Sequence, residues 1–301
     1  MMLRRKFIEI AANLTDPMFQ GSYHGSVKHV PDLEQVLLRS WDVGVDKIII
    51  TGTTLEESRR ALEMSLKDDR LFCTVGCHPT HAGDFEKDGS DPDVYLSELQ
   101  SLIQENRGKV VALGECGLDY DRLHFCDKPT QLKYFEKQLE LSKKLDIPLF
   151  LHCRAAFDDF WTLIDKHRPS SGGVVHSFDG TLPDARKFID AGFKIGLNGC
   201  SLKTQDNLDV ASNLPCESIL LETDCPWCEV RPTHAGFKNI KTKFDAVKKE
   251  KWSPDKLVKS RNEPANIVQI LEILAAVKKV NEDSLCEQIY DNTTKTFFTR
   301  L

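Results

Sequence analysis

The sequence alternates short apolar runs with longer amphipathic stretches, and this alternation restricts the possible fold more than any other feature. Several of the runs, such as VVALGE and SILLET, are almost continuously hydrophobic, which is typical of parallel strands covered by helices. The eight strand-like runs are Lys6–Leu14, Asp46–Gly52, Leu71–Pro79, Val110–Asp119, Pro148–Arg154, Gly173–Phe178, Phe193–Leu197 and Ile219–Asp224.

The stretches between these runs have helical periodicity, clearest at 96–103, 130–145 and 157–164. Eight successive β/α units predict an α/β protein with a single (β/α)8 TIM barrel over residues 1–301, because no Gly/Ser/Pro-rich linker divides the chain. A doubly wound parallel sheet is the alternative. A long segment, Trp227–Arg261, precedes an apolar helix expected at Ile267–Val280, and an excursion of this kind above a barrel mouth often contacts substrate.

Four of the runs place a residue that can bind a metal close to their carboxyl end. These residues are Glu115 in GECGLD, His152 in LHCR, His176 in VVHSF and Asp224 in ETDCP. The carboxyl ends of barrel strands meet at one face, so residues far apart in the sequence can bind a shared cation there. Two imidazoles and two carboxylates suit Zn, Mn or Mg. Any one of them could be an ordinary polar residue, but together they predict a metal site.

Two further residues are candidates for binding a phosphate. His78 in GCHP ends the third run, and we expect it to donate to a substrate phosphate, with a fifth metal ligand as the alternative. Arg154 shares a face with His152 by strand parity and can offer a bidentate fork, unless it forms an inter-strand ion pair instead. Asp119 and Asp121 either orient a ligand or cap the next helix.

The charge balance limits how a polyanion could be bound. The chain has 40 Lys+Arg and 46 Asp+Glu, a formal net charge of −6, so a local basic patch or bound cations must hold a nucleic acid. A basic run is often only a solvated face, but this one is the best candidate for contact with a phosphate backbone. It comprises Lys238, Lys241, Lys243, Lys248, Lys249 and Lys251.

The ten cysteines are scattered and lie mostly in apolar runs, so we interpret them as reduced thiols of a protein that is not secreted. Cys77, Cys116 and Cys153 adjoin three of the candidate residues, and strand parity predicts that they face away from the site. No apolar run approaches the roughly 20 residues that span a bilayer, so no membrane is expected among the partners.

Seven motifs occur in order along nearly the whole chain: GCHP, GECGLDYD, LHCR, VVHSF, ETDCPW, RNEP and NTTKTFF. Together they resemble the TatD family of metal-dependent deoxyribonucleases, and the opening IEIAANLTDPMF is similar to its eukaryotic members. The resemblance implies a (β/α)8 barrel, one or two divalent cations and hydrolysis of DNA. It also implies that Glu115 ligates or bridges the metals, that His152 and His176 bind one of them, and that Asp224 binds the other. His78 and Arg154 match positions that hold substrate phosphate.

The first strand departs from the family pattern. Most members end it with H-x-H, which supplies two further ligands, whereas Ala11 and Asn13 stand here. Ala11 cannot bind a metal and Asn13 offers only an amide oxygen. This loss of imidazole favours a hard, water-retaining ion such as Mg²⁺ over Zn²⁺ or Mn²⁺ at that position.

These observations predict a nuclease that attacks a phosphodiester with a metal-activated water, in which Glu115 and Asp224 are catalytic and Asp224 helps to take the proton. Lys238, Lys241 and Lys243, with His78 and Arg154, would bind the DNA. A barrel hydrolase of amides or esters is one alternative, and a catalytically weak DNA- or metal-binding scaffold is another. A DNA substrate favours the nucleus, with the cytoplasm also open, and no obligate protein partner is evident.

Overall fold

The computed structural model describes residues 5–89 and 91–299. Eight strands alternate with helices, and their order in the sheet is β1-β4-β5-β6-β7-β8-β9-β10. This sequential order is the one expected of successive β/α units. The strands are β1 Phe7–Ala12, β4 Val45–Ile50, β5 Leu71–Val75, β6 Val110–Asp119, β7 Leu149–Arg154, β8 Gly173–Val175, β9 Phe193–Leu197 and β10 Ile219–Leu221.

Helices connect these strands, and two small strand pairs lie outside the main sheet. The pairs are antiparallel β2 Ser22–Tyr23 with β3 Ser26–Val27, and parallel β11 Ala246–Val247 with β12 Leu257–Val258. The α-helices are α1 Leu33–Asp42, α2 Leu55–Ser65, α3 Pro92–Glu105, α4 Lys128–Leu145, α5 Phe157–His167, α6 Leu182–Asp190, α7 Gln205–Asn213, α8 Ile267–Lys278 and α9 Glu282–Phe297. The short 3-10 helices are η1 Pro17–Gln20, η2 Pro79–Gly89, η3 Cys200–Leu202, η4 Cys216–Ser218, η5 Ala235–Asn239, η6 Lys249–Lys251 and η7 Pro264–Asn266.

The chain forms two compact units that are interleaved in sequence. The first unit comprises Met1–Ile49, Ser177–Leu182 and Gly196–Thr293, and the second comprises Ile50–His176, Pro183–Ile195 and Thr294–Leu301. Each unit is described by itself below.

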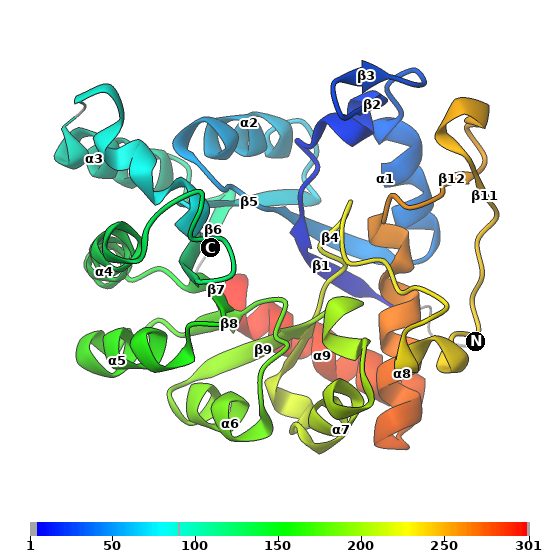
Figure 1. Ribbon diagram of the computed structural model, residues 1–301. Helices are drawn as coiled ribbons and strands as arrows, with labels where there is room; N and C mark the ends of the chain where they lie inside the picture. The colour runs from blue at the N-terminus through cyan, green and yellow to red at the C-terminus, as the bar shows by residue number, and fades with distance from the viewer. Residues whose placement is uncertain (1–4, 90, 300–301) are drawn as a thin grey trace. The chain divides into compact units, whose positions relative to one another are not determined.

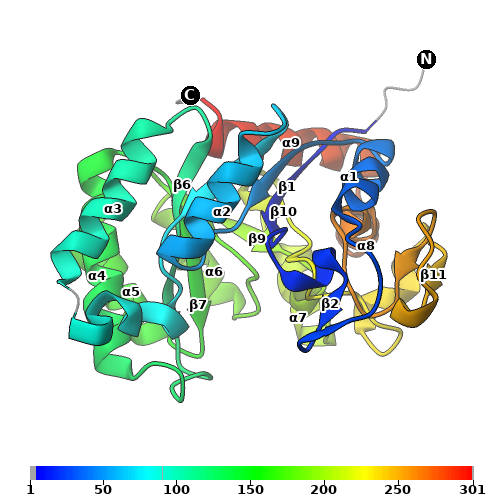
Figure 2. The same cartoon turned by 90° about the horizontal axis from the view of Figure 1, so that it is seen from above.

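The second unit contains a run of parallel strands with helices packed outside them. β5 pairs with β6, β6 with β7, β7 with β8 and β8 with β9, all in parallel. Figures 1 and 2 show α3, α4 and α5 lined up on the outer side of β6 and β7. Every residue of β6 is buried, as the continuous apolar pattern of this run predicts for a covered parallel strand.

The β6–β7 pair is irregular at one residue. The register shifts between Gly114 and Cys116, so Glu115 is the extra residue of a bulge. Bulges re-aim side chains, and this one sets the direction of Glu115. Gly117 has a φ of +148°, and a Cβ there would lie 1.9 Å from the carbonyl oxygen of His152, so only glycine fits. The backbone of these two strands therefore brings Glu115 and His152 close together.

In the first unit, a buried ion-pair network holds the segment that precedes α8. Arg261, only 1 % exposed, lies 2.6 and 2.8 Å from the two carboxylate oxygens of Asp32 and 2.8 Å from Glu263. The next residue, Asn262, donates to the carbonyl oxygen of Thr223 over 2.9 Å. The RNEP motif is thus a structural anchor for the loop after β10. We expect removal of one partner to cost about 3–5 kcal/mol, because it strands a buried charge.

Several strands are shorter than the sequence pattern predicts. β5 ends at Val75, β8 at Val175 and β10 at Leu221, whereas the apolar runs continue to Pro79, Phe178 and Asp224. His78, His176 and Asp224 consequently lie in the loops that follow the strands. The main-chain polar groups of these loops are paired, so the loops can be buried and their sequences can be as apolar as those of strands. The His78 amide, for example, donates to the carbonyl of Thr53 over 2.9 Å.

All ten cysteines are free thiols, and Cys77 and Cys116 are buried as parity predicts, whereas Cys153 is half-buried. Within residues 5–89 and 91–299, none of the helices is long and apolar enough to cross a membrane.

Candidate metal centre

The second unit gathers three imidazoles around one carboxylate. Oε1 of Glu115 lies 2.8 Å from Nε2 of His176, 2.9 Å from Nδ1 of His152 and 3.4 Å from Nε2 of His78. Glu115, His78 and His176 are each at most 6 % exposed. The His176 ring also stacks on Phe150, with centroids 4.7 Å apart, so packing fixes its plane. Four sequence-predicted residues therefore meet in one place.

Asp119 holds the far side of His152. Its Oδ2 lies 3.1 Å from Nε2 of His152, so both ring nitrogens face carboxylates. Oδ1 of Asp119 is buried and has no hydrogen-bond partner among the described residues. The sequence left two roles open for Asp119, orienting a ligand or capping the next helix. Asp127 caps α4, so Asp119 has the orienting role. Asp121 instead pairs with Arg154 at 2.9 Å.

His78 is held as a neutral N–H donor. The Thr80 amide donates to its Nδ1 over 3.1 Å, so the single ring proton of the neutral imidazole sits on Nε2, the atom that faces Glu115. Burial lowers the pKa of His78 to about 3, which keeps the ring neutral at physiological pH. His78 can thus donate a hydrogen bond without carrying a charge.

The electrostatics of Glu115 and His152 are complementary. Burial alone would raise the pKa of Glu115, but His176, His78 and His152 hold it well below its usual range. Burial would likewise lower the pKa of His152, yet the hydrogen bonds to Asp119 and Glu115 raise it. The two carboxylates thus favour the protonated form of His152.

Two buried glutamines of α4 clamp the loops that carry these residues. The Gln138 side chain accepts from the Cys77 amide (2.8 Å) and donates to the Cys77 carbonyl (3.1 Å), next to His78. Gln131 does the same for Asp119, at 2.8 and 3.0 Å. Each side-chain amide supplies hydrogen bonds that a neighbouring strand no longer provides where the strand ends. Both residues are positioning residues.

The donor set of this cluster fits a divalent cation. Ligand atoms of His78, Glu115 and His152 all lie within 4.8 Å of one another. Mixed imidazole and carboxylate ligands suit zinc, manganese or magnesium, and the unpartnered Oδ1 of Asp119 lies on the carboxylate that orients His152. A cation could replace the proton of His152 as the charge that balances Glu115 and Asp119.

Asp224 belongs to the first unit and follows β10. Its Oδ1 accepts from Nδ2 of Asn13 (3.1 Å), and its Oδ2 accepts from the thiol of Cys228 (3.2 Å). Its φ is +53°, a left-handed conformation that Asp adopts more readily than most residues. Asn13, which stands where most family members have a ligand, therefore contacts Asp224 directly through its amide.

A buried acid lies beside the altered first strand. Glu9 is fully buried, and its Oε1 accepts from the amides of Ala11 (2.8 Å) and Thr223 (3.1 Å). Burial raises the pKa of Glu9 to about 8, although these hydrogen bonds oppose the shift. The first unit thus contains a carboxyl group that is largely protonated at neutral pH.

The predicted phosphate-binding residues have different surroundings. Arg154 is half exposed and forms the ion pair with Asp121 that was the alternative for this residue. The Lys241 ammonium pairs with Glu282. Lys238 and Lys243 both line a cavity of the first unit.

The sequence analysis did not select Glu9, Gln131 or Gln138. A signal existed for each: Glu9 is the one charge within the apolar FIEIAA run and shares parity with Ala11 and Asn13, and both glutamines lie on the apolar face of the helical pattern.

Comparison with known proteins gives a consistent result. The sequence model of the family described as TatD related DNase matches residues 12–298. A Schizosaccharomyces pombe protein named deoxyribonuclease Tat-D is 44% identical over 96% of this chain and 94% of its own length. A protein of Escherichia coli strain K12, named as an uncharacterized metal-dependent hydrolase, is 30% identical over 97% of this chain and 98% of its own.

A solved structure agrees with the fold. The crystal structure of a hydrolase TatD family protein from Entamoeba histolytica superposes with a TM-score of 0.92 at 38% identity, covering 98% of this chain and 99% of the other. The predicted fold class, a TIM barrel of eight parallel strands with helices between them, is confirmed.

Proposed function

The chain belongs to the family of TatD-related DNases, and on that premise we propose that it is a metal-dependent deoxyribonuclease that hydrolyses phosphodiester bonds of DNA. The observation that carries the proposal is the buried cluster in which Glu115 contacts His152, His176 and His78, because the carboxylate and imidazoles of Glu115, His152 and His176 are ligand types that fit a divalent cation. The sequence has no Ser or Cys in a G-x-S-x-G elbow or a matching context, which favours direct attack by water.

Glu115, His152, His176 and Asp224 are the proposed metal ligands, with one or two cations in each chain. A divalent cation in such a site neutralises phosphate charge and lowers the pKa of a water molecule. We propose Mg²⁺ because Ala11 and Asn13 remove the imidazoles that would favour Zn²⁺ at the first strand. Asp224 is included because it is the aspartate of the ETDCP motif, which resembles a motif of the family.

The chain's own residues supply the remaining chemistry. Asp224 receives the proton of the attacking water on a carboxylate that Asn13 orients. Asp119 fixes His152 through Nε2, and His78 donates its Nε2 proton to a phosphate oxygen. Arg154, Lys238, Lys241 and Lys243 bind the phosphate backbone of the substrate.

A nuclease assay tests this proposal. Purified protein is incubated with single-stranded and duplex DNA, first with Mg²⁺ and then with EDTA. We expect cleavage that EDTA abolishes and that Asp224→Ala removes. DNA binding without cleavage under any metal would favour a scaffold, and turnover of esters or amides by a protein inert toward DNA would favour the other hydrolase. Either outcome contradicts the proposal.

We also propose that the protein is located in the nucleus, because DNA is its proposed substrate. Tagged protein in a eukaryotic cell should accumulate in the nucleus, while exclusive cytoplasmic signal would contradict it.

A further inference from the structure

The first unit contains a cavity of about 510 Å³, formed by the segment after β10 and the start of α8. Sites for small organic ligands measure about 300–1,000 Å³, so its volume fits one such group. The cavity lies in the segment from 227 to 261, which the sequence analysis selected for substrate contact. The lining residues that matter here are Glu229, Phe237, Lys243, Phe244, Asn266 and Gln269.

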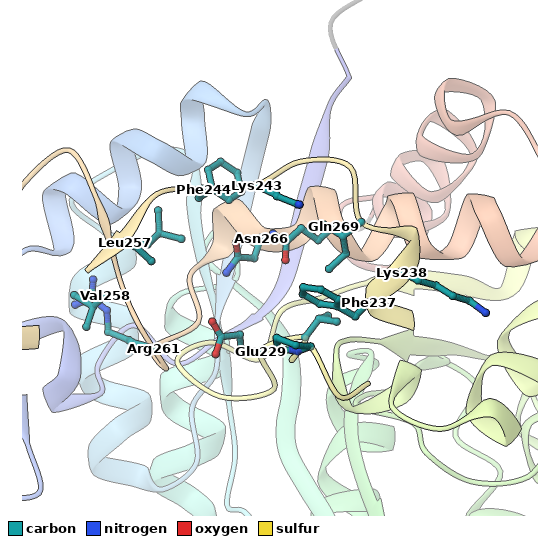
Figure 3. Close-up of a pocket in the computed structure, with 14 residues that line it drawn as sticks. Glu229, Phe237, Lys238, Lys243, Phe244, Leu257, Val258, Arg261, Asn266 and Gln269 are labelled. Carbon is teal, nitrogen blue, oxygen red and sulfur yellow. The ribbon is translucent and has the colours of Figure 1, made fainter. Parts of the chain in front are cut away.

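Two aromatic rings face this cavity from different elements. Phe237 comes from η5, and Phe244 comes from the extended stretch before β11; both are half-buried. Figure 3 shows Asn266 and Gln269 of the η7–α8 region between the two rings, with the Glu229 carboxylate reaching up from the opposite side. Exposed aromatic faces inside a polar surface are suited to stacking on a flat ligand such as a nucleobase.

The Glu229 carboxylate differs from the amides of this cavity because it can only accept hydrogen bonds. Nδ2 of Asn266 donates to Asn262 (2.7 Å) and Nε2 of Gln269 donates to the Thr242 carbonyl (3.1 Å), and each NH2 group keeps a second N–H, so both amides can donate as well as accept. The Glu229 carboxylate has no hydrogen bond or ion pair with a described residue. Burial raises the pKa of Glu229, which indicates poor solvation. A half-buried carboxylate without a partner favours a ligand that presents a hydrogen-bond donor to it.

The cations around the cavity differ in availability. Arg261 lines it, but Asp32 and Glu263 engage its guanidinium. Lys243 is exposed at the edge, where its ammonium can reach a phosphate. The Lys238 ammonium points away from the other labelled side chains in Figure 3. Lys243 is therefore the cation best placed to hold a phosphate attached to a ligand in the cavity.

We propose that this cavity binds a nucleobase with an exocyclic amino group, stacked on the ring of Phe237 or of Phe244 and recognised by Glu229, while Lys243 holds the adjoining phosphate. Carboxylates accept from the N4 amino group of cytosine in known recognition, whereas thymine presents no amino group. The identification of the ligand as part of a DNA strand rests on the proposed nuclease function.

Binding measured in EDTA tests the inference without cleavage. Fluorescence anisotropy at pH 7.5 compares labelled oligo(dC) with oligo(dT) of equal length. We expect tighter binding of oligo(dC), weakened by at least about fivefold in Phe237→Ala or in Phe244→Ala, whichever ring the base stacks on. Glu229→Gln should abolish the preference for oligo(dC). Phe125→Ala, which removes an exposed ring of the second unit, is the matched control and should change nothing.

A conservative variant guards against misfolding: Phe237→Trp should retain oligo(dC) binding, because it keeps a stacking surface. Equal binding of the two oligonucleotides by the natural protein, or full affinity in both alanine variants, would overturn the inference.

The same proteins are then assayed for DNA cleavage with Mg²⁺. If the natural protein cleaves DNA but its cavity variants bind oligo(dC) normally, the inference is overturned and the proposed nuclease function stands. An inert protein that still prefers oligo(dC) through Phe237 would overturn the proposed function alone.

Discussion

The two units surround their buried carboxylates with different partners. In the second unit, Glu115 lies within 3.4 Å of three imidazole nitrogens, and His152 is held between Glu115 and Asp119. In the first unit, Glu9 accepts from the main-chain amides of Ala11 and Thr223, and Asp224 accepts from the Asn13 amide and a thiol. Imidazoles can exchange a proton for a cation, whereas amide donors cannot change their charge. The carboxylate of the second unit is therefore ionised, and Glu9 of the first unit is held largely neutral.

This comparison assigns the two units different tasks. The imidazole-rich cluster provides nitrogen ligands and a titratable charge, which suits the tighter cation-binding position. The amide-lined strand β1 provides only oxygen ligands, which suits a weaker position for a hard ion. The following predictions test this difference in order of expected effect.

The largest effect is expected from His152→Ala. The change removes a proposed ligand and leaves Asp119 and Glu115 without their shared partner, so DNA cleavage should fall by about a thousandfold. Metal content, measured by mass spectrometry, should fall with it. His167→Ala is the control: this histidine of the same unit also pairs with a glutamate, at 2.8 Å from Glu136, but lies at the end of α5. Similar losses in both variants would contradict the assignment.

The next effect concerns stability against pH. Because the folded-state pKa of Glu9 is raised to about 8, its favourable contribution is present below its unfolded pKa near 4.5 and is lost as the pH rises through about 8. Glu9→Gln should therefore stabilise the protein at pH 9 by about 5 kcal/mol, with little effect at pH 4. Denaturant titrations in EDTA measure this difference. A pH-independent effect would mean that Glu9 is ionised in the folded protein.

A smaller effect is expected from Gln138→Leu. Nε2 of His78 lies 3.4 Å from the proposed ligand Glu115, so loss of the clamp on Cys77 should disturb Glu115 through His78 and weaken metal binding by about tenfold to a hundredfold. Calorimetric titration with Mn²⁺ and Mg²⁺ gives the affinity. Gln138→Glu keeps the acceptor for the Cys77 amide and should lose less. Equal losses in both variants would show that the donated hydrogen bond alone matters.

The smallest effect is expected from Asn13→His, which adds an imidazole beside Asp224. Zinc affinity should rise by about tenfold, while Asn13→Ala should give no gain. Ala11 is fully buried, and the corresponding change there would overfill the core. Unchanged zinc affinity in Asn13→His would show that β1 does not line a metal position.

The pattern of apolar runs was sufficient to predict most of the fold. The bounds of β6 and β9 agree with the predicted runs, because a strand buried on both faces leaves an unbroken hydrophobic signature. The ends of β5, β8 and β10 were placed too far along the chain. Their loops are equally apolar, and a hydrogen bond such as that from the His78 amide to Thr53 leaves no trace in the sequence.

The candidate site was predictable in part. His78, Glu115, His152 and His176 were predicted because each lies close to the carboxyl end of an apolar run, and the second unit brings all four together. Asp119 was left between two roles, and only its 3.1 Å contact with His152 assigns it to orientation. The placement of Asp224 with those four residues remains a prediction.

The sequence alone determined the order of strands and helices, the family and the identity of the chemical groups, because apolar periodicity and motif residues are local in the chain. Only the tertiary structure decided how those groups are charged and held. The bulge at Glu115, the clamp of Gln138 and the protonation of Glu9 each depend on residues distant in sequence. Burial and hydrogen bonding act through space, and no local pattern records them.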